Sequence, residues 1–124
     1  MKFYRCETCG NIITKLNDSG VPVVCCGKPM TELVPGSSDG AFEKHVPAVT
    51  VEGSIVKVQV GEVEHPMLPE HFIQFIALET TSGAQIKYLK AGDKPVADFT
   101  VADGDKPVAV YEYCNLHGLW VKEL

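Results

Sequence analysis

Short runs in which apolar and polar residues alternate dominate the chain from residue 54 onward. They cover residues 54–60, 71–78, 85–89, 96–101, 108–113 and 119–121, and β-branched or aromatic side chains are frequent in them. Gly or Pro lies between most runs, and strands that recur roughly every ten residues with such turns predict an antiparallel sandwich or barrel. One run is ambiguous, because Phe72, Phe75 and Ile76 would also share one face of a helix. No long amphipathic helix is predicted.

The chain changes character near residue 35. The segment before it holds four of the five cysteines and no histidine, whereas all four histidines and the fifth cysteine come later. Between the two parts lies Pro35-Gly36-Ser37-Ser38-Asp39-Gly40, a turn-rich stretch without large apolar side chains that is typical of a linker. We therefore expect two domains, residues 1–36 and residues 37–124.

The composition narrows the class of protein. An apolar share of 45% suits a folded domain, and a net charge of −5 argues against a nucleic-acid partner, which requires a basic face. No stretch approaches the roughly 20 apolar residues of a membrane helix. The first residues, Met-Lys-Phe-Tyr-Arg-Cys, lack the apolar run of a signal peptide. We therefore expect a cytoplasmic protein with reduced thiols, and an odd number of cysteines agrees with this.

The four cysteines of the first domain form one candidate metal centre. Cys6 and Cys9 are separated by two residues, whereas Cys25 and Cys26 are adjacent. Four thiolates suit zinc or iron in a tetrahedral site. Adjacent side chains of an extended segment point apart, so Cys25 and Cys26 can bind one ion only if the backbone between them bends. Structural zinc sites usually avoid such adjacent ligands, so this spacing makes iron a stronger candidate than usual. Either ion would replace a hydrophobic core that this short segment cannot build.

A second candidate centre combines nitrogen and sulfur ligands. The four histidines, each beside a turn or a strand end, and the last cysteine are the candidate ligands: His45, His65, His71, His117 and Cys114. Five protein ligands overfill a tetrahedral zinc site but suit an iron ion that keeps one position for a small substrate. A thiolate opposite that position would push electron density toward the substrate. The set predicts redox chemistry on a small oxygen species.

Two charged residues precede the first histidine. A Glu43–Lys44 pair is, by itself, most often a solvated pair of surface charges. Next to an open metal position, however, Lys44 could attract an anion and supply a proton through an organised water. Glu43 could bind the oxidised metal, because a carboxylate favours the harder ferric ion.

At this point the chain resembles a known family, the desulfoferrodoxins, which are two-iron superoxide reductases. The similarity extends over essentially the whole length. It is carried by the four-cysteine set, residues 40–47, His65-Pro66-Met67, His71 and residues 112–118. The resemblance implies an all-β protein: a desulforedoxin-like domain at 1–36 with a four-cysteine iron, and an immunoglobulin-like β-sandwich at 37–124 with the catalytic iron.

The resemblance also implies roles for individual residues. The four histidines would lie in the equatorial plane of the catalytic iron, with His117 binding through Nδ1 and Cys114 as the axial ligand. Glu43 would bind the ferric state, and Lys44 would assist substrate capture and protonation. The implied reaction is the one-electron reduction of superoxide to hydrogen peroxide, with electrons from rubredoxin or a similar carrier. A homodimer is expected.

Two other functions stay open at this stage. The protein could be an electron-transfer protein whose working centre is the four-cysteine iron, although a five-ligand site with an open position argues against this. It could also be a zinc-knuckle binding module with incidental histidines. No flavin or nicotinamide fingerprint is present, which agrees with an electron supply from another protein.

Overall fold

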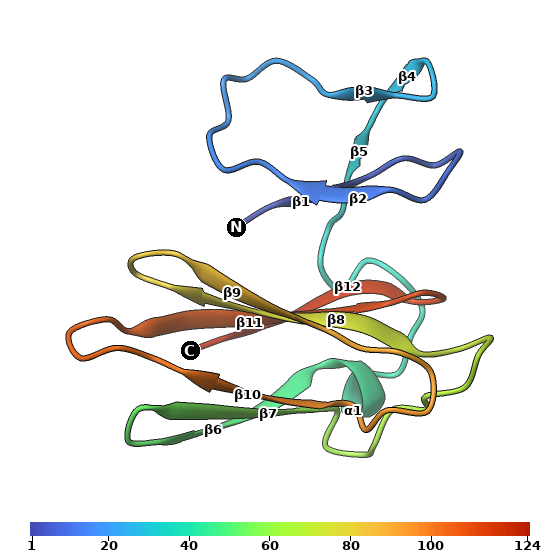
Figure 1. Ribbon diagram of the computed structural model, residues 1–124. Helices are drawn as coiled ribbons and strands as arrows, with labels where there is room; N and C mark the ends of the chain where they lie inside the picture. The colour runs from blue at the N-terminus through green and yellow to red at the C-terminus, as the bar shows by residue number, and fades with distance from the viewer. The chain divides into compact units, whose positions relative to one another are not determined.

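The computed structural model describes all 124 residues, which form two compact units, Met1–Val34 and Pro35–Leu124 (Figure 1). The first unit contains only short strands. They are β1 (Phe3–Arg5), β2 (Ile12–Thr14), β3 (Val24–Cys25), β4 (Lys28–Pro29) and β5 (Thr31–Glu32). Three of them form an antiparallel sheet in the order β2-β1-β5, and β3 pairs with β4 in a separate hairpin.

The first unit has almost no hydrophobic core. Phe3 and Cys6 are its only buried residues, and several valines and Leu16 are exposed. Segments this short need another source of stability, such as a bound metal. The structure therefore agrees with the expectation that an ion replaces the core here.

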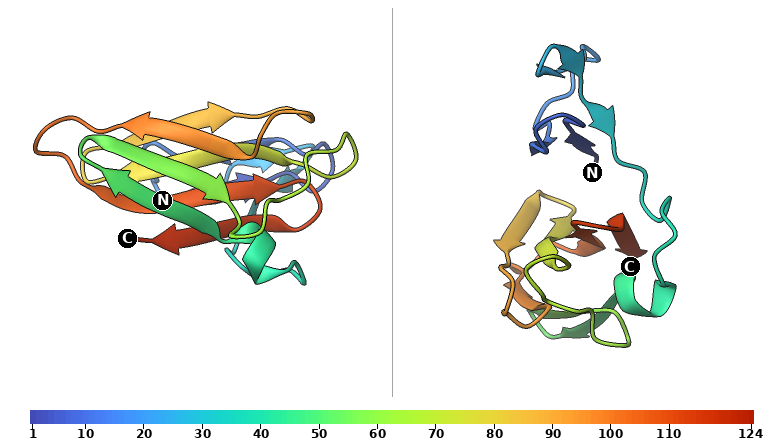
Figure 2. Two further views of the ribbon diagram at one scale, coloured as in Figure 1. Left: turned by 90° about the horizontal axis from the view of Figure 1, so that it is seen from below. Right: turned by 90° about the vertical axis from the view of Figure 1, so that its right-hand side faces the viewer.

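The second unit is a β-sandwich preceded by one helical turn. Its elements are α1 (Phe42–His45), β6 (Pro47–Glu52), β7 (Ile55–Val60), β8 (Ile73–Thr80), β9 (Ala84–Tyr88), β10 (Val96–Thr100), β11 (Pro107–Cys114) and β12 (Gly118–Glu123). The strands form two antiparallel sheets, β10-β7-β6 and β12-β11-β8-β9, which face each other as two layers in Figure 2. The predicted all-β sandwich is confirmed.

The core of the sandwich follows the period-2 pattern of the sequence. Val56, Val58 and Val60 of β7 point inward, and the residues between them are exposed. Ile76 and Leu78 of β8 meet them from the opposite sheet, in one cluster of buried side chains. Each such side chain contributes about 1.5–3 kcal/mol when it leaves water. This core fixes the strand ends from which the candidate ligands project.

The ambiguous run proves to be a strand. Residues 73–80 form β8, which pairs with β11 on one side and β9 on the other, so tertiary pairing excludes the helical alternative. The other predicted strands are also present, with small differences at their ends. The five short strands of the first unit were not predicted, and in the second unit two elements were missed: the edge strand β6, which begins at Pro47, and the four-residue helix α1. Proline is tolerated at the start of an edge strand, and so short a helix has no sequence period to detect.

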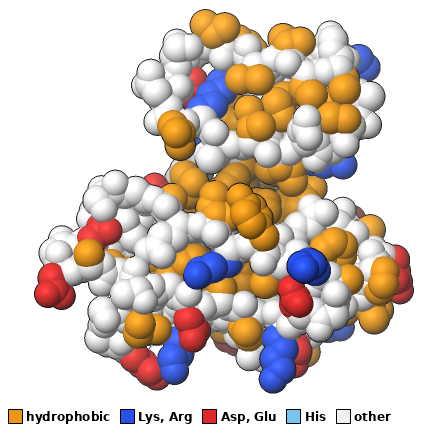
Figure 3. Space-filling view, in the orientation of Figure 1, with side chains coloured by type: hydrophobic (Ala, Val, Ile, Leu, Met, Phe, Trp, Pro, Cys, Tyr) orange, Lys and Arg blue, Asp and Glu red, His pale blue; other side chains and the backbone are white.

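The surface and the helix content add two further facts. Acidic and basic side chains are interspersed over the face of the larger unit that Figure 3 displays, and this face shows no extended basic patch. The only helix is four residues long, whereas a membrane-spanning helix needs about 20.

Candidate metal centres

The four cysteine sulfurs of the first unit converge. The Sγ atoms of Cys6, Cys9, Cys25 and Cys26 all lie within 4.8 Å of one another, and none of them forms a disulfide. The first pair comes from a tight turn, in which the N–H of Gly10 donates to the carbonyl of Cys6 over 2.9 Å. Gly10 has a φ of +83°, a conformation that a glycine adopts without strain. The turn thus brings both sulfurs to one point.

The adjacent cysteines Cys25 and Cys26 reach the same point because the backbone turns between them. Cys25 pairs with Lys28 across the β3–β4 hairpin, so Cys26 and Gly27 are the two central residues of its turn. Both have positive φ values, +52° and +76°, as a type I′ turn requires. Cys26 is the only residue other than glycine with a positive φ. The left-handed conformation turns its side chain to the same side as that of Cys25.

The electrostatics of this group favour a bound cation. The backbone N–H of Cys9 donates to the Cys6 sulfur and lowers the pKa of this thiol to about 6. A hydrogen bond with the Cys9 sulfur raises the pKa of Cys26 to about 12. Like charges this close cannot all ionise together. Four thiolates are therefore compatible with this spacing only around a metal cation, and sulfur ligands in this number suit iron or zinc.

The histidines and the fifth cysteine meet at one end of the sandwich. His45 ends α1, His65 and His71 lie in the connection between β7 and β8, Cys114 ends β11, and His117 lies in the turn before β12. Their five ligand atoms lie within 4.8 Å of one another. The strands converge from segments far apart in the sequence, so the structure brings together every ligand that the sequence suggested for this centre.

The four imidazole rings form a square. Neighbouring rings are His45–His65, His65–His71, His71–His117 and His117–His45, with centroids 4.6, 4.6, 5.1 and 4.8 Å apart and planes nearly perpendicular. The diagonal pair His45–His71 is 6.5 Å apart and closer to parallel, at 28°. Rings at the corners of a square direct their nitrogens toward a common centre.

Hydrogen bonds fix the proton position of two rings. Nδ1 of His45 lies 2.8 Å from the carbonyl oxygen of Ala41, and Nδ1 of His65 lies 2.6 Å from that of Pro66. A carbonyl oxygen only accepts, so both Nδ1 atoms carry the proton and both Nε2 atoms present lone pairs. Burial is the main reason that the pKa of His45 is lowered and that of His65 falls to about 4. Both rings are therefore neutral near pH 7, the form that binds metals.

The spacing of the nitrogen atoms fits a metal ion. Nε2 of His45 lies 3.1 Å from Nε2 of His65, and two lone pairs face each other there because both rings carry their proton on Nδ1. Nε2 of His45 also lies 3.1 Å from Nδ1 of His117. Two nitrogens 3.1 Å apart that bind one ion at a right angle lie about 2.2 Å from it, near the usual metal–imidazole length; at a tetrahedral angle they would lie about 1.9 Å from it, which is too short. Nε2 of His71 is buried without a hydrogen-bond partner. These residues fit a metal held by four imidazoles in a plane.

Cys114 supplies the fifth donor from the interior of the sandwich. It is completely buried in the hydrophobic core, and its Sγ lies 3.9 Å from Nδ1 of His117. Burial raises the pKa of this thiol, while the backbone N–H groups of His117 and Leu116 donate to the sulfur and oppose the increase. A metal cation would bind the thiolate form, because binding releases the proton.

A tryptophan joins two ligands that are distant in sequence. Trp120 is buried, its indole N–H donates to the carbonyl of His117 over 3.0 Å, and its ring stacks on His45 with centroids 5.0 Å apart. The backbone of Gly40 passes so close that a Cβ atom there would lie 2.9 Å from the indole and 3.0 Å from His45. Only a glycine permits this close approach.

The comparisons with known proteins follow the division of the chain into two units. Residues 37–123 match the desulfoferrodoxin family, and residues 1–33 match the desulfoferrodoxin N-terminal domain. The chain belongs to the desulfoferrodoxin family. It is 46% identical to the desulfoferrodoxin of Syntrophotalea carbinolica, over 99% of this chain and 96% of that protein. It is 47% identical to the desulfoferrodoxin of Nitratidesulfovibrio vulgaris, over 98% of this chain and 95% of that protein.

Solved structures give the same result. The crystal structure of the superoxide reductase from Treponema pallidum matches with a TM-score of 0.82 at 36% sequence identity, and the match covers 98% of both chains. The two ligand groups, one of four cysteines and one of four histidines with a cysteine, correspond to the two iron centres of a desulfoferrodoxin.

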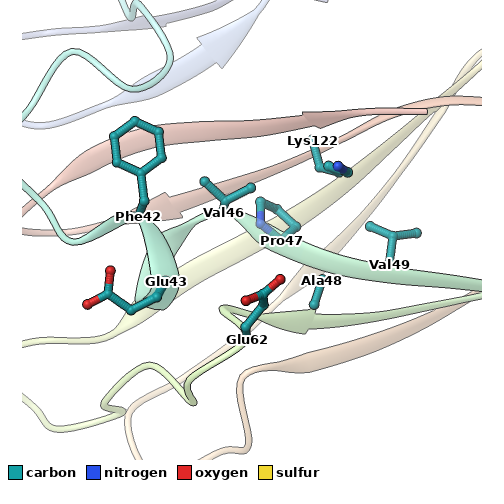
Figure 4. A pocket seen from close by; sticks show the side chains of 8 residues that line it. All are labelled: Phe42, Glu43, Val46, Pro47, Ala48, Val49, Glu62 and Lys122. Carbon is teal, nitrogen blue, oxygen red and sulfur yellow. The ribbon is translucent and has the colours of Figure 1, made fainter.

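Glu43 and Lys44 occupy exposed positions on α1, directly before His45. The positive charge of Lys44 contributes, after burial and His117, to the lowered pKa of His71, which places the charge near the imidazole group. Glu43 lines a hollow of about 550 Å³ beside α1, shown in Figure 4 with Glu62 and Lys122. None of the candidate ligands lines this hollow, because the ligand side chains fill the space around their own centre.

The backbone of Glu43 and Lys44 is held by the loop that follows β7. The N–H of Val63 donates to the carbonyl of Glu43 over 2.9 Å, and the backbone of Gly61 packs against both residues. Gly61 has a φ of +82°, so both its conformation and its surroundings require a glycine. The loop therefore sets where α1 presents its charged side chains.

Sequence reasoning missed a buried acid in this part of the fold. Glu112 is completely buried on the face of β11 that carries Val110 and Cys114, and neither carboxylate oxygen has a hydrogen-bond partner. Burial raises the pKa of this carboxyl well above its ordinary value, because burial disfavours the charged form. The signal was present in the sequence, because Val110, Glu112 and Cys114 share one face of a strand.

Proposed function

We propose that this chain is a superoxide reductase that reduces superoxide to hydrogen peroxide at the centre formed by His45, His65, His71, His117 and Cys114. The observation that carries the proposal is the convergence of four imidazoles in a square with one thiolate. Membership of the desulfoferrodoxin family and the similarity to a solved superoxide reductase support it. Five donors leave a metal that prefers six ligands one further position for a small substrate.

Iron, when bound to these five residues, supplies the electron that the reaction requires. Superoxide takes up one electron and two protons and becomes hydrogen peroxide, with its O–O bond intact. His45 and His65 would bind the metal as neutral imidazoles, the form that their burial favours. The Cys114 thiolate stabilises the oxidised metal because sulfur is a strong electron donor. Imidazole and thiolate together thus support a metal that cycles between two oxidation states.

The charged residues of α1, Glu43 and Lys44, act on the substrate and on the oxidised metal in this proposal. Lys44 is exposed and its charge reaches the imidazole group, so it attracts the superoxide anion toward the centre. Lys44 also organises the water from which protons reach the reduced oxygen. The Glu43 carboxylate is a hard oxygen ligand that would hold a ferric ion. Both roles rest on the position of the helical turn directly before His45.

The first domain, residues 1–36, holds the second iron between Cys6, Cys9, Cys25 and Cys26 in this proposal. A rubredoxin-like carrier returns electrons to the protein, which acts as a cytoplasmic homodimer. The sandwich domain, residues 37–124, carries out the reaction. A colourless protein containing zinc alone would contradict the assignment of both centres and would favour a zinc-knuckle binding module.

The reaction is tested by its stoichiometry. Protein reduced in advance is mixed with a limiting amount of superoxide, and hydrogen peroxide and dioxygen are both measured. A reductase gives one hydrogen peroxide for each superoxide and no dioxygen. Dismutation instead gives one hydrogen peroxide and one dioxygen from two superoxide ions. Dioxygen release in that ratio would contradict the proposed function. The absence of a rapid loss of superoxide would also contradict it and would favour a pure electron-transfer protein.

Replacement of Lys44 by alanine is expected to slow the capture of superoxide. At an ionic strength of roughly 0.01 M, where charges act over about 30 Å, we expect the second-order rate constant to fall by about tenfold. The dependence of this rate on salt should weaken at the same time. Pulse radiolysis over a series of salt concentrations measures both quantities.

Lys87→Ala is the matched control, because it removes the same charge from an exposed position on β9. Its rate constant should stay near that of the wild type. Equal rates for Lys44→Ala and the wild type at low salt would exclude the steering role.

A further inference from the structure

The side chain of Asn115 links two ligand segments that are far apart in the sequence. Asn115 directly follows Cys114, and its Oδ1 accepts a hydrogen bond from the N–H of Phe72 over 2.9 Å. Its Nδ2 donates to the carbonyl of Glu70 over 3.1 Å. The backbone N–H of Asn115 also donates to the carbonyl of Phe72, over 3.2 Å. Three hydrogen bonds from one residue therefore hold the chain on both sides of His71.

His71 depends on such support more than His45 and His65 do. It lies outside the regular strands, in a narrow turn where Leu68 and His71 exchange two backbone hydrogen bonds of 2.9 and 3.0 Å. For its ring the structure shows no carbonyl acceptor, unlike the rings of His45 and His65. The position of its Nε2 atom is thus set by the backbone that carries it.

Two residues that are not ligands, Trp120 and Asn115, connect the ligand segments to one another. Trp120 contacts His45 and His117. Asn115 connects the segment of Cys114 to that of His71, which Trp120 is not seen to contact. The β8–β11 ladder itself is irregular here, with a register shift between Tyr113 and Cys114. The regular strand pairing therefore does not fix the distance between His71 and Cys114. The side-chain amide of Asn115 instead connects the two segments, through Phe72 and Glu70.

We propose that Asn115 is a positioning residue of the catalytic centre: it sets the His71 imidazole relative to the Cys114 thiolate. The proposal rests on the proposed function, because it concerns the metal that these two ligands share. Groups that orient metal ligands without binding the metal typically contribute 10- to 100-fold in metal affinity. Asn115 and Glu70 lie near the surface, where water can satisfy the backbone groups that a smaller side chain would release. Its loss should therefore loosen the site without unfolding the domain.

The test compares iron binding in Asn115→Ala, Asn115→Asp and the wild-type full-length chain. Aspartate keeps the acceptor for Phe72 N–H but loses the donor to Glu70, so it should give an intermediate effect. Gln85→Ala is the matched control, because it removes another side-chain amide that donates to a backbone carbonyl, that of Thr100, over 2.8 Å. Each protein is loaded with ⁵⁷Fe, and Mössbauer spectra record the two centres separately while a chelator removes the metal.

We expect Asn115→Ala to retain iron in the histidine–cysteine centre about 10- to 100-fold less tightly than the wild type. The Mössbauer doublet of this centre should broaden, whereas the four-cysteine doublet should not change and serves as an internal standard. Gln85→Ala should match the wild type in both signals. The unfolding midpoint of the metal-free Asn115→Ala protein should stay close to that of Gln85→Ala.

Wild-type iron retention and an unchanged doublet in Asn115→Ala would overturn the proposal. A large loss of stability in the metal-free Asn115→Ala protein, relative to Gln85→Ala, would also overturn it, because the role would then be general to the fold. Iron retention does not require turnover, so a wild-type protein that binds iron but fails the stoichiometry test would contradict the proposed reaction and leave the result for Asn115 valid.

Discussion

Replacement of Cys114 by serine is expected to remove nearly all superoxide reductase activity. A neutral hydroxyl replaces a thiolate, so the metal loses its strongest electron donor and one negative charge. Even residues that only orient a ligand typically contribute 10- to 100-fold, so loss of the ligand itself should lower the rate of superoxide reduction by more than about 100-fold. The sulfur-to-iron absorption band of this centre should disappear at the same time. Stopped-flow kinetics and the visible spectrum measure the two effects.

Cys9→Ser provides the comparison for Cys114→Ser. It removes one thiolate from the four-cysteine group, which lies in the other compact unit. We expect Cys9→Ser to change the absorption of that centre and to retain a rapid first reaction with superoxide. Wild-type activity in Cys114→Ser would contradict the role of the thiolate as a metal ligand.

Replacement of Gly61 by alanine is expected to be strongly destabilising. A Cβ atom at this position would collide with the carbonyl oxygen of Val63 and lie 2.7 Å from both the carbonyl oxygen of Glu43 and the carbonyl carbon of Lys44. All these neighbours are backbone atoms, which cannot rotate away. The positive φ of Gly61 adds strain of about 1–2 kcal/mol, and overpacking adds about 1–3 kcal/mol. We expect the free energy of unfolding to fall by about 2–5 kcal/mol.

Gly104→Ala separates the two causes. Gly104 has nearly the same φ, +86°, but no atom lies within 4 Å of the position that a Cβ would take. Its replacement should therefore cost only the conformational part, about 1–2 kcal/mol. Urea denaturation of the metal-free proteins measures both changes. Similar losses for Gly61→Ala and Gly104→Ala would show that the contact with α1 has no energetic importance.

Periodicity and turn residues were sufficient to predict most of the fold. The strands β7 to β12 were found because their apolar residues alternate and Gly or Pro separates them, and the core uses this alternation in Val56, Val58 and Val60. The edge strand β6 was missed because its first residue is a proline and because it lies beside the first histidine segment. The helix α1 was missed because a single turn depends on the tertiary contacts of its backbone.

The identity of the candidate ligands was also readable from the sequence, because only a few residue types bind transition metals and this chain contains few of them. Cysteine and histidine are chemically distinctive, and their positions beside turns suggested two centres. The supporting residues were not readable in the same way. Gly61 and Asn115 belong to common residue types, and each becomes notable only through a neighbour from another segment: the α1 backbone or the His71 turn.

The amino-acid sequence alone determined the donor atoms, the alternating pattern of the sandwich and the division into a cysteine-rich and a histidine-rich part. Only the tertiary structure decided that four rings stand at the corners of a square, which nitrogen of His45 and His65 is free and how Cys26 turns toward Cys25. The reason is physical. Donor type is a property of a single residue, whereas distances, tautomers and backbone conformations arise from contacts between distant segments, such as His45 and His117, which are 72 residues apart in the chain.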